Sequence, residues 1–264
     1  MNLKKMLALA AAAAMTLSLA SCSSGKKVAS VEDLAGARIG VQLGTTGDIY
    51  IEGDIEKGIF EGATLEKYSK GIDAIQALKQ NKLDAVVIDN EPAKAFVAQN
   101  DDLTLLETPY TEEEYAICVA KENDELTEKI NGAIAELKTD GTLEAILDKY
   151  INKTEGAAGY VTPEGTEHPN GELVMATNAY FEPYEYYEGD TIVGIDVEFA
   201  TAICDKLGYT LKVEDMEFDS IIAAVQSGKA DFGAAGMTVI EDRLQNIDFT
   251  DSYCTGIQSI VVKK

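Results

Sequence analysis

The chain has 264 residues, of which 46% are hydrophobic and 7% aromatic, a composition typical of a globular protein large enough for two lobes. The formal net charge of −24 argues against a nucleic-acid partner, because phosphate binding requires clustered Lys and Arg. The single histidine, His168, lies in a polar stretch, so nucleophilic hydrolase chemistry lacks a general base. No metal ligand set or cofactor motif is found, and we expect neither group.

The N-terminal region predicts a targeting segment. Two lysines precede an apolar, alanine-rich run over residues 6–19, which is too short for a membrane span and is typical of a signal peptide. The quartet Leu19-Ala20-Ser21-Cys22 resembles the lipoprotein cleavage box of bacteria, which implies a signal peptide over 1–21 and a lipid on Cys22. A lipid-anchored tether would then cover residues 22–30. An ordinary secretory signal that happens to carry a cysteine is the alternative.

A turn and strand over residues 34–43 lead into Gly44-Thr45-Thr46-Gly47 and a helix from Asp48. Backbone N–H groups and hydroxyls at a helix start suit a carboxylate or a phosphate. The same residues also suit a helix N-cap without any ligand.

A second strand-to-helix junction lies around Asp89. A strand over 64–68, a helix over 71–80 ended by Asn81, and a buried strand over 83–88 precede this residue, and Pro92 starts the next helix. Ligands of open α/β sheets bind at the carboxyl ends of strands, where Asp89 is expected. Its alternative role is an N-cap for the following helix.

The remaining elements are predicted in chain order from periodicity and turn residues. The first half continues with a strand over 103–106, a polar connection over 109–114, a strand over 115–120, helices over 124–138 and 142–150, and a linker over 152–170. The second half contains a strand over 173–177, an aromatic loop over 178–186, a helix from 194 to 207, a strand over 209–213, a helix over 219–226 and a last strand over 257–262.

The stretch 235–243 carries the strongest sign of a binding site. Its small residues allow close backbone approach, Thr238 offers a hydroxyl, and Arg243 can grip a carboxylate with two parallel bonds. These groups suit an α-amino acid. A surface arginine paired with Glu241 or Asp242 is the alternative.

An internal repeat predicts two lobes of similar construction. Residues 75–84 resemble residues 222–231, each a helix followed by a Lys and an Asp that enters a strand. Of the cysteines after Cys22, Cys204 is expected to be buried, and Cys118 and Cys254 form either a disulfide or two free thiols.

Several motifs resemble the extracellular solute-binding proteins of polar amino-acid ABC transporters. The motifs are Phe181-Glu-Pro-Tyr-Glu-Tyr, Gly194-Ile-Asp-Val-Glu-Phe-Ala, Ala235-Gly-Met-Thr-Val-Ile-Glu-Asp-Arg243, Leu83-Asp-Ala-Val-Val-Ile-Asp89 and the segment ending in Gly44-Thr45-Thr46. The resemblance implies a two-lobed, periplasmic-binding-protein-like type II α/β fold. Each lobe would hold a mostly parallel sheet flanked by helices, and a two-strand hinge would join the lobes.

The order of these motifs differs from that of the family, in which the segment here placed last comes first. The sequence therefore resembles a circular permutation, which is tolerated where the ends of a domain lie close together. The implied parts are a first lobe of 115–151 plus 171–254, a second lobe of 31–110 plus 259–264, hinge crossings at 111–114 and 255–258, and a joining linker at 152–170.

Residue by residue, the resemblance implies nine ligand-binding positions. Phe181 and Phe218 would sandwich the ligand side chain, and Arg243 with Thr46 would hold the α-carboxylate. The α-ammonium would be held by Asp89, Thr238 and the backbone of Gly236, and Ala235 belongs to the same set. Asn178 stands where an acidic residue often meets a basic ligand, so a polar neutral amino acid is favoured.

The resemblance implies a monomeric receptor that hands an amino acid to an ABC transporter permease. It would be lipid-anchored on the extracellular face of the cytoplasmic membrane. A surface amino-acid sensor is one alternative. A dehydratase-like enzyme on the same scaffold is another, with Glu182, Glu185 or Asp89 as its acid or base.

Overall fold

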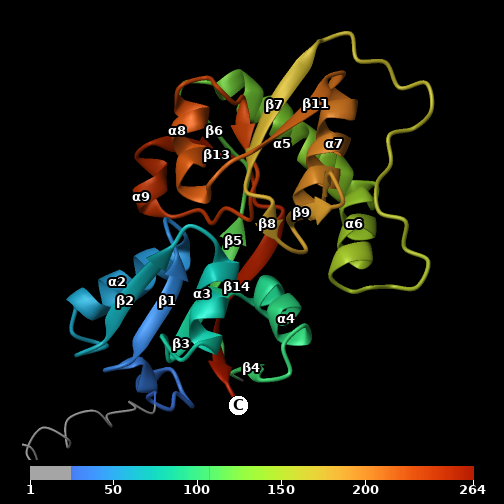
Figure 1. Ribbon diagram of the computed structural model, residues 1–264. Coiled ribbons are helices and arrows are strands. Elements are labelled where there is room, and N and C mark those ends of the chain that lie inside the picture. Colours follow the sequence, from blue (N-terminus) through green and yellow to red (C-terminus); the bar gives the residue numbers. More distant parts are fainter. Residues whose placement is uncertain (1–24, 107) are drawn as a thin grey trace, which may run out of the picture.

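The computed structural model describes residues 25–106 and 108–264, which form two lobes placed one above the other (Figure 1). The predicted signal peptide and Cys22 lie outside the described residues. Each lobe is a β-sheet covered by helices, as expected for an α/β protein. Within the described chain, every helix is too short or too polar to cross a lipid bilayer.

The sheet of the second lobe, at the bottom of Figure 1, has the strand order β2-β1-β3-β14-β4, with β5 also paired to β14. Its strands are β1 (Arg38–Gln42), β2 (Thr64–Tyr68), β3 (Ala85–Asp89), β4 (Leu103–Leu105), β5 (Thr111–Tyr115) and β14 (Cys254–Lys263). Its helices are η1 (Glu32–Leu34), α2 (Thr46–Glu56), α3 (Gly71–Lys79) and α4 (Asn90–Ala98). Asn81, with φ 61°, ends the segment after α3, as its preference for left-handed backbone predicts.

The sheet of the first lobe has the order β11-β7-β12-β6-β13. Its strands are β6 (Cys118–Ala120), β7 (Glu172–Thr177), β11 (Thr210–Asp215), β12 (Phe232–Gly233) and β13 (Ile247–Phe249). A small antiparallel sheet of β8 (Tyr180–Phe181), β9 (Glu185–Glu188) and β10 (Thr191–Val193) lies beside it. The helices are α5 (Asp124–Thr139), α6 (Thr142–Tyr150), α7 (Ile195–Leu207), η2 (Phe218–Ser220), α8 (Ile221–Gln226) and α9 (Glu241–Leu244).

Both sheets are mixed, with a parallel part and an antiparallel part. The pairs β1–β2, β1–β3, β7–β11 and β7–β12 are parallel, whereas β14 and β6 run antiparallel to their neighbours. The antiparallel strands are those that enter a lobe from the region between the lobes. Each sheet is thus mostly parallel, as the sequence predicts, with one antiparallel strand along its main order, β14 in the second lobe and β6 in the first.

Residues between the lobes are strands where a polar connection over 109–114 is predicted. Strand β5 pairs antiparallel with β14 from Thr111↔Gln258 to Tyr115↔Cys254. A Cβ on Gly256 would lie 2.2 Å from the Tyr115 ring, so a glycine is required where this ring crosses β14. The predicted strand 115–120 is interrupted between β5 and β6, and the last strand is longer than 257–262 because β14 serves both the hinge region and the second lobe.

Two further segments differ from the sequence prediction. The aromatic loop 178–186 contains β8 and the start of β9, which pair through Phe181↔Glu185. The end of the predicted tether packs on the second lobe, because Val28 is buried and the Lys26 N–H donates to Asp84 Oδ1 at 2.8 Å. Residues 152–170 contain no helix or strand, as a linker predicts.

Hydrophobic side chains fill both faces of each sheet. One core cluster packs Ile39, Val41 and Ile51 in the second lobe, and another packs Ile221, Val225 and Met237 in the first. The third and largest cluster includes residues of both lobes, with the Tyr115 ring in its interior. The cysteines at 118, 204 and 254 are free thiols, and Cys118 and Cys204 are buried.

Candidate functional site

A cavity between the lobes lies at the carboxyl ends of β1 and β3 on one side and of β7 and β12 on the other. Its lining side chains lie close together and leave a cavity volume of about 10 Å³. All nine residues predicted from the sequence line it: Thr46, Asp89, Asn178, Phe181, Phe218, Ala235, Gly236, Thr238 and Arg243. The expectation that ligands bind at the carboxyl ends of strands (the strand-end rule) is met by residues that are far apart in sequence: Thr46 and Arg243 are 197 positions apart.

Arg243 is the buried cation of this cavity. It lies on α9, whose N-cap Ile240 makes no side-chain cap bond, and its residue exposure is 4%. Its guanidinium donates to the Thr238 carbonyl at 2.8 Å and, across the cleft, to the Gly44 carbonyl at 3.0 Å. Among the described residues, no carboxylate oxygen lies within 4.0 Å of it, so the surface ion pair with Glu241 or Asp242 is not formed. Burial lowers the pKa of Arg243, and the negative charge of Glu113 opposes this shift without cancelling it, so the cation is only partly compensated.

The guanidinium also lies 5.4 Å from the centroid of the Phe218 ring, close enough for a cation–π contact. Phe218 is half-buried, and Phe181 is buried on the opposite element β8. Gly236 has φ +53°, and a Cβ at this position would come within 2.8 Å of the Phe181 ring. A glycine is therefore needed here for both its backbone conformation and its lack of a side chain.

The sequence leaves two roles open for the start of α2, helix capping and ligand binding, and Thr45 and Thr46 differ in which of them they suit. Thr45 is the N-cap, and its side chain accepts from the Asp48 N–H at 3.4 Å. The Thr46 hydroxyl points into the cleft, donates to Glu113 Oε2 at 3.0 Å and lies 3.5 Å from the Thr238 hydroxyl of the other lobe. Thr46 is therefore available at the site while its neighbour caps the helix.

Asp89 ends β3 and precedes α4 without a side-chain cap bond. Its carboxylate instead accepts from the Tyr115 hydroxyl. Burial first, and then the negative charge of Glu113, raise the pKa of Asp89 to about 7. A positive group placed beside Asp89 would restore its ionised form.

Asn178 lies at the end of the cavity lined by Phe181 and Gln42. Its Oδ1 accepts from Gln42 Nε2 at 3.0 Å across the cleft, and its Nδ2 donates to the Met216 carbonyl at 2.8 Å. This side chain is thus fixed in orientation and carries no charge.

Three residues of the site were not identified from the sequence as ligand-binding. Gln42 lies at the end of β1, and the strand-end rule could have found it. Glu113 accepts from Thr46, Thr238 and Gln258, but nothing in the run 112–114 distinguishes it from its neighbours. Glu185 lines the cavity fully buried, and burial followed by the charge of Asp196 raises its pKa well above the ordinary value.

A family model, for bacterial extracellular solute-binding proteins of family 3, matches residues 62–153 and 173–264 of this chain. The chain belongs to this family. Every residue that lines the cavity except Gln42, Thr45 and Thr46 lies within the two matched blocks. The unmatched residues between the blocks coincide with the segment that has no regular structure.

Curated relatives within this group match shorter segments. The arginine-binding extracellular protein ArtP of Bacillus subtilis (strain 168) is 45% identical over 100 residues, which are 38% of this chain and 39% of the relative. The L-cystine-binding protein TcyJ of Escherichia coli (strain K12) is 28% identical over 125 residues, 47% of this chain and 45% of the relative. These alignments span less than half the length of either relative.

Among solved structures, an ancestral arginine-binding protein bound to glutamine is 42% identical. The similarity covers 32% of this chain and 38% of that chain, with a TM-score of 0.31. The probable amino-acid ABC transporter extracellular-binding protein YtmK of Bacillus subtilis is 10% identical over 86% of this chain and 83% of that chain, with a TM-score of 0.46.

Proposed function

We propose that this solute-binding protein is the extracellular receptor of an ABC importer for a polar amino acid. The observation that carries the proposal is one enclosed cavity that holds a buried cation without a full counter-charge, Arg243, and a buried acid, Asp89. An α-amino acid brings a carboxylate for the first and an ammonium for the second. Each buried charge would then be paired, as the high cost of unpaired buried charge requires.

The side-chain end of the cavity favours a polar neutral ligand over a basic one. Asn178 is uncharged, and burial raises the pKa of Glu185, which favours the neutral form of its carboxyl. Phe181 and Phe218 offer apolar surfaces for the methylene groups of the ligand. The relatives named for arginine and cystine support a polar amino acid as the class, and the fixed Asn178 amide favours its neutral members.

We infer that ligand binding closes the two lobes about the paired strands β5 and β14. The crossings at 111–114 and 255–258 would bend, while 31–110 plus 259–264 and 115–151 plus 171–254 would move as lobes. Bonds that span the cleft, such as Arg243 to Gly44 and Gln42 to Asn178, would form on closure and break on opening. The closed form would dock on the permease, and a lipid on Cys22 would hold the protein at the membrane.

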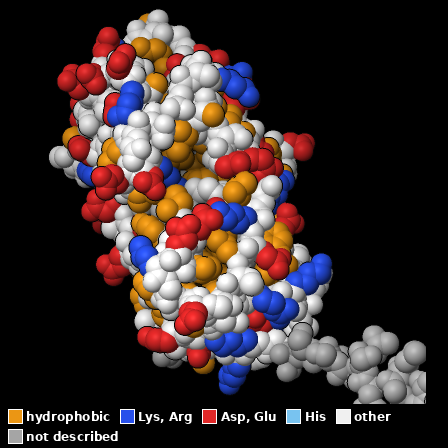
Figure 2. Space-filling model, turned by 90° about the vertical axis from the view of Figure 1, so that its left-hand side faces the viewer, with side chains coloured by type: hydrophobic (Ala, Val, Ile, Leu, Met, Phe, Trp, Pro, Cys, Tyr) orange, Lys and Arg blue, Asp and Glu red, His pale blue; other side chains and the backbone are white. Residues whose placement is uncertain are grey.

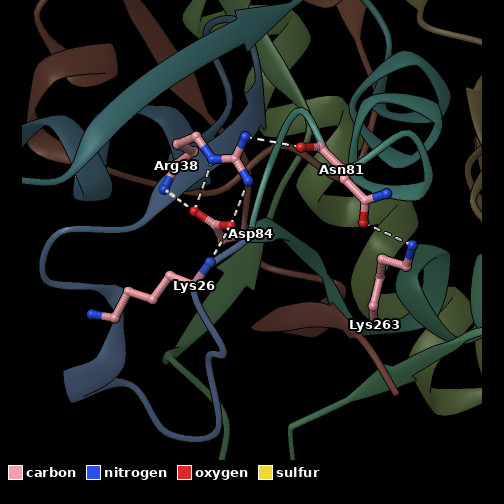
Figure 3. A network of polar contacts seen from close by, with 5 residues as sticks. All are labelled: Lys26, Arg38, Asn81, Asp84 and Lys263. Carbon is pink, nitrogen blue, oxygen red and sulfur yellow. Dashed lines mark hydrogen bonds and ion pairs between the residues drawn. The ribbon is translucent and has the colours of Figure 1, made fainter. Parts of the chain in front are cut away.

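We also propose that the two lobes occur in exchanged order relative to the family. The two matched blocks are separated by the linker, and the segments near residues 26 and 263 meet at the lower end of the second lobe. Lys26 bonds to Asp84, Arg38 joins Asp84 to the Asn81 carbonyl, and Lys263 bonds to the Asn81 side chain (Figure 3). Ends held this close are what a permutation requires.

The test is a thermal-shift screen of the chain from Ser23 onward against the twenty amino acids, followed by calorimetry. A ligand that binds only the folded state raises the melting temperature by mass action. We expect a clear shift with one or a few polar neutral amino acids and a smaller shift with their des-amino analogues. A chain that melts cooperatively but responds to no amino acid would refute the receptor proposal.

A further inference from the structure

The lower end of the second lobe carries a cluster of basic side chains in an otherwise acidic protein. We call it the basal surface and define it by six residues: Lys26, Lys27, Arg38, Lys82, Lys263 and Lys264. Figure 2 shows blue side chains gathered around the point where the described chain begins, at the lower end of the molecule. Acidic side chains are distributed over much of the rest of that view.

Contacts within the protein hold these residues together at one place. Asp84 accepts from the Lys26 N–H at 2.8 Å and from the Arg38 guanidinium at 2.7 Å, and the Arg38 guanidinium also donates to the Asn81 carbonyl (Figure 3). Lys263 Nζ donates to Asn81 Oδ1 at 2.9 Å, and Lys82 directly follows Asn81. Three chain segments that are far apart in sequence thus bring their cations to one surface.

Most of these cations have no acidic partner within the protein. The Arg38–Asp84 pair is internally neutralised, since Asp84 is buried beneath it. Among the described residues, no carboxylate oxygen lies within 4.0 Å of the ammonium groups of Lys26, Lys27, Lys82, Lys263 and Lys264, and all five residues are exposed. Lys79, whose carbonyl accepts from Lys263 Nζ, lies 4.0 Å from Asp102 Oδ1 through its own ammonium group. Some exposed lysines elsewhere, such as Lys129 and Lys212, do have such partners.

The position of the predicted lipid attachment gives this surface a partner. Cys22 precedes Lys26 by four residues, so a fully extended chain places the lipid within about 14 Å of Lys26. We propose that the basal surface is a membrane-contact face that binds the anionic phospholipid headgroups of the bilayer to which the protein is anchored. This inference rests on the anchoring part of the proposed function.

Charge and geometry agree with this assignment. An anionic membrane strengthens the binding of a nearby cation by about fivefold per Lys or Arg, and a lipid chain combined with a basic patch anchors more firmly than either alone. Contact through the lower end of the second lobe would leave the cavity between the lobes well above the headgroups (Figure 1). The lobes could then open and close without the membrane covering the cleft.

The test measures vesicle binding by the chain from Ser23 onward, which keeps every described helix and strand. Co-sedimentation with vesicles of phosphatidylglycerol and phosphatidylcholine is compared with pure phosphatidylcholine vesicles, at about 50 and 500 mM salt. The variant Lys27→Gln/Lys82→Gln/Lys264→Gln removes three free cations. The matched control, Lys138→Gln/Lys153→Gln/Lys229→Gln, removes three exposed lysines from outside the second lobe that likewise have no carboxylate oxygen within 4.0 Å among the described residues.

We expect binding only to the anionic vesicles, a loss at high salt, and at least a tenfold weaker association for the basal variant than for the control. Equal binding to both kinds of vesicle, or equal loss in both variants, would overturn the proposal. Melting temperature and amino-acid affinity are measured in parallel for each variant. A chain that binds anionic vesicles through its basal surface but binds no amino acid would refute only the receptor proposal, and the converse would refute only this one.

Discussion

Replacing Arg243 by methionine tests the carboxylate end of the site. Arg243 is buried, donates to backbone carbonyls of both lobes and has no carboxylate within 4.0 Å among the described residues. The change would leave the carboxylate of a bound amino acid buried without its cation. Breaking a buried charge pair in this way costs about 3–5 kcal/mol. The dissociation constant should therefore rise by between roughly 100-fold and several thousand-fold.

Isothermal titration with the amino acid found in the screen measures this loss. Arg243→Lys keeps the positive charge but lacks the planar guanidinium, so its affinity should lie between that of wild type and that of Arg243→Met. Arg38→Met is the matched control, because it removes a bonded, partly buried arginine at the basal surface. This control should lower the melting temperature and leave the affinity unchanged. If Arg243→Met binds within threefold of wild type, the carboxylate lies elsewhere and the site is wrongly assigned.

Three further predictions concern charge and connectivity. In competition titrations, Asp89→Asn should lower the affinity for amino acids more than the affinity for their des-amino analogues. Equal losses of affinity for both would show that Asp89 does not bind the ammonium group. Because the pKa of Asp89 is about 7, affinity should fall as pH drops below 7, and Glu113→Gln should move this fall to lower pH by removing a negative charge. The raised pKa of Asp89 also affects the stability of the ligand-free protein: it stabilises the fold below about pH 4, and this contribution is lost as pH rises through 7. The melting temperature of wild type relative to that of Asp89→Asn should therefore decrease as pH rises. If neither the affinity nor this difference in melting temperature changes with pH, the pKa assignment is wrong. Joining Lys264 to Lys26 by a short glycine-rich linker and opening the chain within 152–170 should give a folded protein of unchanged affinity, whereas failure to fold would contradict the exchanged order.

Much of the site could be predicted because it follows from where strands end. Asp89 ends a buried apolar strand, and Arg243 follows a strand that stops at small residues, so both lie at carboxyl edges of their sheets. Which of Thr45 and Thr46 caps the helix and which faces the cleft could be decided only from the structure. The two residues have similar side chains, and only the direction of each side chain separates their roles.

The strand pairing within the predicted hinge crossings and the small sheet could not be predicted, because both depend on pairing between distant segments. Residues 112–114 are three consecutive glutamates with no apolar alternation, and they are ordered by bonds to β14 more than 140 positions later. Their register decides that Glu113 faces the cleft while its neighbours face away. Likewise, β8 becomes a strand only because β9 returns beside it.

The charges of the cavity also explain why a ligand would favour the closed form. In the closed arrangement without ligand, Arg243 is desolvated with no carboxylate within 4.0 Å among the described residues, and Asp89 is desolvated beside Glu113. Both effects penalise closure of the empty protein. A zwitterion pairs with Arg243 and Asp89 together and removes both penalties only when the lobes meet around it. Such a ligand interacts differently with the open and closed states, and this difference in free energy is what shifts a conformational equilibrium. A carboxylic acid without an amine would relieve only the Arg243 penalty, so it should close the lobes less completely than the parent amino acid.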